Sequence, residues 1–219
     1  MGNSVQDFPL ILLCGGKSSR MGQPKGLIDA KGKPFLERQL DRFRDAGGKR
    51  VVVVLGYDMQ PYVQALSWLS AAPGIWTERD GLFRSVVVNT LPQYGPFSSI
   101  TSGAEIVLAR KDRGAFILPV DVPAADKDVW EKLVNSFSGP VQACLPVFKG
   151  RGGHPVLLAR TFLLALLHIP VDSPEARLDR QLRTIDQDQV ARVFVNDERI
   201  LKNMNTPGDL ETVLGKKWL

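Results

Sequence analysis

Short apolar runs that do not alternate with polar residues recur between amphipathic segments along this chain of 219 residues. Such runs are typical of parallel strands that are buried on both faces, and the amphipathic segments are typical of the helices that cover them. The clearest runs are Phe8 to Cys14, Val51 to Leu55 and Ala115 to Val120. The pattern predicts an α/β fold, a doubly wound mixed, mainly parallel sheet with right-handed crossovers.

Weaker patterns supply the other expected elements. Leu36, Leu40 and Phe43 follow helical spacing, which predicts a helix between Pro34 and Gly47. No internal repeat and no long linker breaks the order, so we expect one domain, with its ligand site beyond the carboxyl ends of the strands. The remaining predictions are helices over 61–70, 100–110, 126–137, 162–168, 175–184 and 206–214, and strands over 85–88, 141–148, 154–158, 192–196 and 200–202.

The composition restricts the class of protein further. The net charge is +5 and 44% of the residues are hydrophobic, which is close to the globular average and excludes disorder and coiled coils. No block of basic residues points to nucleic acid, and the longest apolar run near the middle, Phe162 to Leu167, is far shorter than a membrane helix. The N-terminus lacks the basic segment of a signal peptide, and Cys14 and Cys144 are not in a zinc-type spacing. We expect a cytoplasmic protein without a nucleic-acid or membrane partner, whose mild positive charge suits a small anionic substrate.

The most informative segment follows the first predicted strand directly, and it reads Leu13-Cys-Gly-Gly-Lys-Ser-Ser-Arg-Met-Gly-Gln-Pro-Lys25. Its glycines allow close backbone approach and positive φ, and its three cations, Lys17, Arg20 and Lys25, occur without an acid. These properties suit a loop that holds phosphates. A surface turn with incidental lysines is the alternative.

Two common nucleotide motifs do not fit this loop. Gly16-Lys-Ser18 resembles the end of a P-loop, but that pattern needs a glycine five positions earlier, where Ile11 lies inside the strand. The Gly-x-Gly-x-x-Gly pattern of dinucleotide-binding loops cannot be placed on residues 13–25 either. The loop is therefore neither a P-loop nor a dinucleotide-binding loop of the common type.

The pattern Gly15-Gly-x-Ser-x-Arg-Met-Gly-x-x-Lys25 closely resembles the signature loop of the nucleotidyltransferases that attach a nucleotide to the molybdenum cofactor, both guanylyltransferases and cytidylyltransferases. The resemblance implies a Rossmann-like, nucleotide-diphospho-sugar transferase-like fold, in which the loop wraps a nucleoside triphosphate. It also implies nucleotide contacts from Leu13, Gly15 and Gly16, and catalytic roles on the phosphates for Arg20 and Lys25.

Asp121 ends the apolar run in Leu118-Pro-Val-Asp-Val-Pro123 and is the candidate acid of the site. Nucleotidyl transfer needs a divalent cation to neutralise charge at the α-phosphorus and on pyrophosphate, and Mg²⁺ prefers carboxylate oxygens. The segment looks like the Asp-x-Pro element of the resembled family, whose aspartate binds magnesium, so the resemblance implies that Asp121 binds Mg²⁺ and the nucleotide and is catalytic. A turn or helix-capping aspartate is the alternative.

The segment Asn203-Met-Asn-Thr-Pro-Gly-Asp-Leu210 resembles the closing motif of the same family, in which a strand end supplies side-chain oxygens to the metal or the phosphates. Alternation places Asn203 and Asn205 on one side of that strand, as neutral metal ligands beside Asp121. Thr206 as the N-cap of the last helix is the alternative explanation of the motif.

Two further segments carry the resemblance. Around Gly95-Pro96 and Ser102-Gly103 it implies that Asn89 and Ser102 lie near the nucleotide, whereas a polar helix start is the alternative. In the same segment Ser98-Ser99 departs from the small apolar residues usual in the guanylyl branch. The segment Gly153-His-Pro-Val156 resembles a motif of the cytidylyl branch that faces the acceptor, where His154 either meets a phosphate or pterin or is only structural.

Together these residues predict a Mg-dependent nucleotidyltransferase, a single domain over residues 1–219, that joins GMP from GTP to the terminal phosphate of molybdopterin and releases pyrophosphate. No general base is expected, because a phosphate oxygen is already ionised at neutral pH. The alternatives are CTP on the same cofactor, another phosphorylated acceptor, and an inactive nucleotide-binding module. The resemblance also allows a molybdoenzyme or a chaperone as a protein partner.

Overall fold

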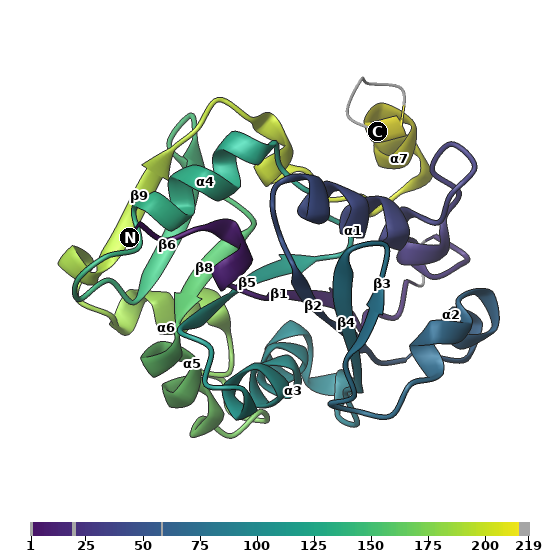
Figure 1. Cartoon of the computed structure of the whole chain (residues 1–219), viewed down its shortest axis with the longest axis horizontal. Helices are drawn as coiled ribbons and strands as arrows, with labels where there is room; N and C mark the ends of the chain where they lie inside the picture. The colour runs from purple at the N-terminus through teal and green to yellow at the C-terminus, as the bar shows by residue number, and fades with distance from the viewer. Residues whose placement is uncertain (1, 19–20, 58, 215–219) are drawn as a thin grey trace.

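Nine strands form one sheet in the computed structural model, which describes residues 2–18, 21–57 and 59–214 (Figure 1). The strand order is β3-β4-β2-β1-β5-β8-β6-β7, and β9 pairs with β6. The strands are β1 (Leu10–Cys14), β2 (Arg50–Leu55), β3 (Thr77–Arg79), β4 (Leu82–Val88), β5 (Gly114–Pro119), β6 (Ala143–Phe148), β7 (Arg151–Gly152), β8 (Val156–Ala159) and β9 (Val190–Phe194).

The direction of the strands changes across the sheet. β1 is parallel to both β2 and β5, and β2 is parallel to β4. β8 runs antiparallel to β5 and to β6, while β6 and β9 are parallel. The predicted mixed, mainly parallel sheet is confirmed. β1 lies within its parallel part, and the glycine-rich loop begins at the carboxyl end of β1.

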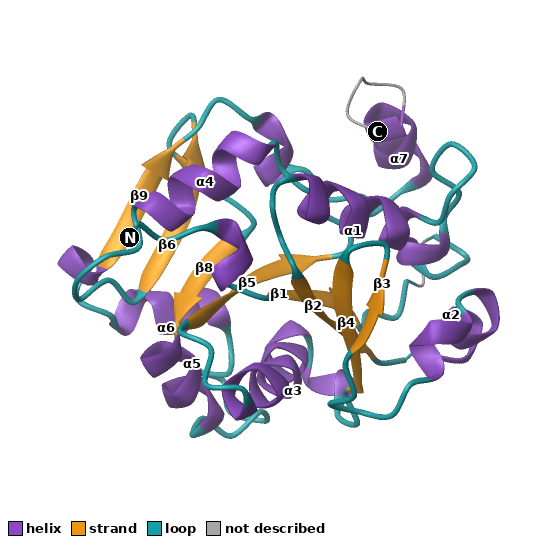
Figure 2. Ribbon diagram, viewed as in Figure 1, coloured by secondary structure: helices purple, strands orange, loops and turns teal. Residues whose placement is uncertain are grey.

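Helices cover both faces of the sheet, as Figure 2 shows. α1, α4 and α7 lie on one face and α3, α5 and α6 on the other. In the part of the chain that the structure describes, no helix is both long and apolar enough to cross a bilayer. The helices are α1 (Phe35–Asp45), α2 (Met59–Ala65), α3 (Pro96–Ala109), α4 (Lys127–Asn135), α5 (Arg160–Leu167), α6 (Leu178–Thr184) and α7 (Pro207–Leu214).

β1 is buried along its whole length because it contributes to a hydrophobic core on each face. Leu10 and Leu12 pack in the core that includes Trp130 of α4, whereas Ile11 and Leu13 belong to the second core, which includes Ile100 of α3. This double burial is the physical reason why the strand reads as an unbroken apolar run.

The structure differs from the predicted local elements at the following three places. The predicted strand over 200–202 is a 3₁₀ helix, Glu198–Leu201, because the Asp197 carboxylate accepts a hydrogen bond from the Arg199 backbone and caps this turn. The edge strand β3 was not predicted, since its side chains are all exposed and show no apolar pattern. The predicted helix over 61–70 is divided into α2 and a 3₁₀ helix, Ser67–Ser70.

Candidate active site

Lys25, Asp121 and Asn205 meet at the carboxyl end of β5. The Lys25 Nζ atom lies 2.7 Å from Asp121 Oδ2 and 2.8 Å from Asn205 Oδ1. Lys25 begins a 3₁₀ helix after the glycine-rich loop, and its backbone N–H donates to Ser18 Oγ across 3.2 Å. The fold thus brings together three of the predicted site residues. Asp121 and Asn205 lie 96 and 180 positions after Lys25 in the sequence.

Asn205 is held in place by the residues that follow it. The Asp209 carboxylate accepts hydrogen bonds from the backbone N–H groups of Asn205, at 3.0 Å, and Thr206, at 2.8 Å. The hydrogen bond from the Thr206 side chain is the main cause that lowers the pKa of Asp209 below its usual value. The Met204 N–H also donates to the Asp121 carbonyl across 2.9 Å, which fastens this segment to the end of the sheet.

A cavity of about 490 Å³ opens beside this cluster. Its lining combines charged and polar groups with uncharged residues from the start of α3 and the preceding turn. Leu13, Gly15 and Gly16, to which the resemblance assigns nucleotide contacts, line this cavity. The sequence did not single out the two tyrosines or the glutamine that also face it, and it noted Ser99 only as a departure from the guanylyl branch. The lining residues are Leu13, Cys14, Gly15, Gly16, Lys17, Ser18, Lys25, Tyr57, Tyr62, Pro92, Gln93, Gly95, Pro96, Ser99, Pro119, Val120, Asp121 and Asn205.

Gly15 is required by close backbone packing at the start of the loop. A Cβ atom added to Gly15 would lie 2.9 Å from Ser99 Oγ, and one added to Gly56 would lie 2.6 Å from the Gly15 carbonyl oxygen. These distances are shorter than ordinary van der Waals contact. Glycine at position 15 therefore allows the end of β1 to pack closely on α3, and glycine at position 56 allows the end of β2 to pack closely on the backbone of Gly15.

Asn89 and Ser102 lie outside this cavity. Both line a separate space of about 410 Å³ on the other side of α3. The Asn89 Nδ2 group donates to Ser98 Oγ and Ser99 Oγ, and the Ser102 hydroxyl donates to the Ser98 carbonyl of its own helix. The two side chains thus support the start of α3, which was the alternative considered for this segment.

The expected strand that places Asn203 beside Asn205 is absent among the described residues 202–206. Asn203 is exposed, and its backbone carbonyl accepts a hydrogen bond from the Asn205 N–H. That turn removes the strict alternation, so of the two asparagines only Asn205 contacts Lys25 and lines the cavity. Arg20, the remaining predicted phosphate contact, lies outside the described residues.

The oxygens of Asp121 and Asn205 form a donor set that fits a hard divalent cation. Both reach the same cation, the Lys25 ammonium group, from segments far apart in the sequence. Across residues 2–18, 21–57 and 59–214, no three His, Cys, Asp or Glu side chains gather into a metal-holding group. One carboxylate and one amide oxygen suit Mg²⁺, which usually keeps several water or phosphate ligands.

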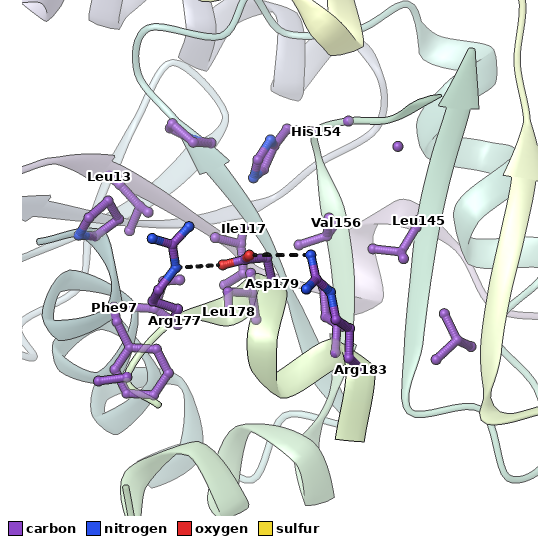
Figure 3. Close-up of a pocket in the computed structure, with 18 of the residues that line it drawn as sticks. Leu13, Phe97, Ile117, Leu145, His154, Val156, Arg177, Leu178, Asp179 and Arg183 are labelled. Carbon is purple, nitrogen blue, oxygen red and sulfur yellow. Dashed lines mark hydrogen bonds and ion pairs between the residues drawn. The ribbon is translucent and has the colours of Figure 1, made fainter. Parts of the chain in front are cut away.

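A larger cavity of about 860 Å³ adjoins the first, and Leu13, Pro96 and Pro119 line both. Figure 3 shows that its wall combines apolar residues with Arg177 and Arg183, which flank Asp179. The Arg177 Nε–H donates to Asp179 Oδ1 across 3.0 Å, and Arg183 lies 3.8 Å from the other carboxylate oxygen.

Arg192 also lines this larger cavity, so three arginines face one acid there. The sequence analysis did not predict this basic wall. Its arginines are spread over α6, the residue before it and β9, and only the fold brings them to one cavity. The clustering of arginines over 177–192 was the available signal. A cavity with apolar walls and excess positive charge suits a flat organic anion.

His154 lines the larger cavity as a neutral group. Burial lowers the pKa of the imidazole to about 4, and the nearby negative charge of Asp121 opposes this shift only in part. The His154 backbone N–H donates to the Ile200 carbonyl across 2.9 Å, which holds the loop against the 3₁₀ helix. At neutral pH the side chain therefore offers hydrogen bonding rather than charge.

Cys14 lines the smaller cavity without acting as a nucleophile. Burial, followed by the negative charge of Asp121, raises the pKa of the Cys14 thiol far above its usual value. Because the thiolate is the reactive form of cysteine, the protonated thiol is inert at neutral pH.

Known proteins match both the sequence and this architecture. The profile of the MobA-like NTP transferase domain matches residues 10–193. A protein of Rhodopirellula baltica, named a probable molybdenum cofactor guanylyltransferase, is 27% identical over 212 residues, which cover 91% of this chain and 88% of that protein.

Solved structures share the fold at lower identity. A nucleotidyl transferase from Methanothermobacter thermautotroptrophicus superposes with a TM-score of 0.73 at 18% identity, over 95% of this chain and 96% of the other. A Mycobacterium tuberculosis protein in complex with manganese gives a TM-score of 0.66 at 18% identity, over 95% and 98% of the two chains. The match over residues 10–193 includes the glycine-rich loop, Asp121 and the larger cavity, so the chain belongs to the MobA-like NTP transferase domain family and is a nucleotidyltransferase of that type.

Proposed function

We propose that this protein is a Mg²⁺-dependent guanylyltransferase that joins GMP from GTP to the terminal phosphate of a molybdopterin-type cofactor and releases pyrophosphate. The observation that carries the proposal is the cluster of Lys25, Asp121 and Asn205 in the cavity of the glycine-rich loop, which adjoins a second cavity with a basic, partly apolar wall. The described site residues come from one sheet and from the loops and helices that connect its strands, which supports a single nucleotidyltransferase domain over residues 1–219.

The nucleotide occupies the smaller cavity in this proposal. Lys17 and Lys25 neutralise the triphosphate, with Arg20 assigned to the same role from the sequence pattern. Leu13, Gly15 and Gly16 lie against the nucleotide. Asp121 and Asn205 would hold the divalent cation, which supplies charge neutralisation at the α-phosphate and the departing pyrophosphate. The manganese complex of the fold relative supports a divalent ion, and the oxygen donor set favours Mg²⁺.

The acceptor occupies the larger cavity. Its apolar residues suit a flat ring system, and Arg177, Arg183 and Arg192 suit a phosphate group. The two cavities share a wall, so an acceptor phosphate at the boundary lies beside the α-phosphate of the nucleotide. The acceptor oxygen is ionised at neutral pH, so positioning and charge neutralisation supply catalysis without a general base.

Guanine is the preferred base because the relative matched over most of both chains is named a guanylyltransferase. CTP is the second candidate, since Gly153-His-Pro-Val156 resembles the cytidylyl branch and His154 lines the larger cavity.

The deciding experiment supplies the protein with Mg²⁺, molybdopterin and either [α-³²P]GTP or [α-³²P]CTP. We expect label to transfer from GTP to the cofactor with stoichiometric release of pyrophosphate. Transfer from CTP alone would assign the cytidylyl activity instead. Nucleotide binding without pyrophosphate release would favour a binding module, and turnover only with another phosphorylated acceptor would exclude molybdopterin.

A further inference from the structure

Ser99, near the start of α3, carries a hydroxyl group that can donate a hydrogen bond to few other groups. The serine is 4% exposed, and its Oγ atom lies close to Gly15 in the wall of the smaller cavity. Asn89 donates to this oxygen across 3.0 Å. The serine therefore already serves as an acceptor on its buried side.

The orientation of the Asn89 amide is determined by its other contacts. Asn89 Oδ1 accepts the Leu91 N–H at 2.9 Å, so Nδ2 is the group that faces the two serines. Ser98 in turn donates to the carbonyls of Gly95 and Leu91, at 2.8 and 3.0 Å. These contacts fix the orientation of Asn89 and Ser98, and the Ser99 hydroxyl donates to neither of them.

Among the described residues, the Ser99 hydroxyl donates no hydrogen bond, and its one side-chain hydrogen bond is the one it accepts from Asn89. A buried donor without an acceptor costs free energy, and the side chain lines the cavity. The hydroxyl is thus a preset donor for whatever fills this end of the cavity.

The ligand group at this end follows from the distribution of charge. Lys25, Asp121 and Asn205 form a charged and polar cluster in this cavity, where a triphosphate and its cation belong. The cavity around Ser99 is lined instead by uncharged residues, including Gly15, Gly95 and Pro96. An uncharged, hydrogen-bonding part of the ligand fits there.

We infer that Ser99 is a specificity-determining residue that donates a hydrogen bond to an acceptor atom of the nucleoside, with Asn89 as the residue that positions its hydroxyl group. The inference deepens the proposed function and rests on it only in taking a nucleoside triphosphate as the ligand of this cavity.

The test compares Ser99→Ala with wild type by calorimetric titration with GTP and with inorganic tripolyphosphate, which has the phosphates but no nucleoside, each in the presence of Mg²⁺. We expect the Kd for GTP to rise about 5- to 10-fold, the usual value of one neutral hydrogen bond, and the Kd for tripolyphosphate to stay unchanged. Lys25→Met should weaken both ligands. Ser102→Ala makes the same chemical change one helical turn later, on the side of α3 that lines the other space.

The inference is overturned if Ser99→Ala binds GTP as wild type does, if it loses affinity equally for tripolyphosphate, or if Ser102→Ala shows the same loss. Thermal unfolding of each variant establishes that the fold is intact. Should wild type bind CTP and not GTP, the guanylyl assignment fails, and the same comparison made with CTP still decides the role of Ser99.

Discussion

Lys25 and Asp121 form an ion pair whose ammonium group lies 2.7 Å from the carboxylate and also contacts the Asn205 amide oxygen. These are the two oxygens that would hold the divalent cation. The lysine therefore serves as their cationic partner before a metal binds, and metal and lysine compete for the same ligands. A triphosphate that draws the ammonium group away from Asp121 would strengthen metal binding.

Lys25→Met should raise the affinity for Mn²⁺ in the absence of nucleotide by about tenfold. The Lys25 ammonium group lies beside the oxygens that would bind the metal, and its repulsion of a second cation costs more than about 1 kcal/mol. Free Mn²⁺ measured by electron paramagnetic resonance gives the Kd directly. Lys17→Met is the matched control, since it removes the same charge from the same loop, where Lys17 lies over the Tyr57 ring rather than beside Asp121. Equal or weaker Mn²⁺ binding in Lys25→Met would contradict this competition.

Asp121→Asn should lower the rate of nucleotidyl transfer at least about 100-fold, because it removes the only carboxylate beside Lys25 in the described cluster and with it the charge that binds the metal. The side chain is 23% exposed, and a pair of this kind contributes about 1 kcal/mol or less to folding. The melting temperature should therefore change by only a few degrees. Pyrophosphate release and thermal unfolding measure the two effects, and substantial turnover in this variant would remove Asp121 from the mechanism.

Arg183→Gln should raise the KM for the acceptor about 3- to 10-fold and leave the KM for GTP unchanged, because one charge-assisted hydrogen bond to a phosphate is lost. Arg180→Gln provides the control on the same helix. Arg180 pairs with Glu175 at 3.1 Å and does not line the larger cavity. A shift in the KM for GTP, or an equal effect of both variants, would show that α6 does not select the acceptor.

The neutral state of His154 makes stability depend on pH in a definite direction. Burial lowers the folded-state pKa from 6.5 to about 4, so the unfolded chain binds an extra proton between these values. The stabilising effect of the neutral group is complete above pH 6.5 and is lost as the pH falls towards 4. Between pH 7 and 4.5, wild type should lose about 2 kcal/mol more stability than His154→Gln in urea unfolding. Parallel pH profiles for the two proteins would refute the buried neutral state.

Gly15→Ala should destabilise the fold by about 1–2 kcal/mol, since overpacking forces neighbouring atoms to move. The added Cβ lies 2.9 Å from Ser99 Oγ, so Ser99→Ala should relieve most of this cost in the double variant. A double-mutant cycle measured by urea unfolding tests the coupling. Additive effects would indicate that another contact limits position 15.

The sheet centre and the main ligand cluster were predictable from sequence for the same reason. β1, β2 and β5 are buried on both faces, so their apolar runs identify them, and the residues that follow their carboxyl ends meet at one edge. Lys25 and Asp121 were found in this way. Asn205 was found through the resemblance of its motif, although the predicted strand around it is wrong.

The rest of the site depends on tertiary contacts that leave no periodic pattern in the sequence. Asn89 looks like a ligand in sequence, whereas its amide is occupied by Ser98, Ser99 and the Leu91 backbone. Ser99 becomes visible as a donor only once those bonds are known. Arg177 and Arg183 face a cavity because the turn before α6 folds back over β8 and the start of α3, and side-chain direction there is a tertiary property.

The attachment of Asn205 to Asp209 has a consequence for biosynthesis. The glycine-rich loop and β1 leave the ribosome early, but the amide oxygen that completes the cluster is oriented by a carboxylate near the end of the described chain. A nascent or prematurely terminated polypeptide that lacks Asp209 could assemble most of the sheet and still hold an unfinished centre. Catalytic competence should therefore arise only after translation has passed Asp209.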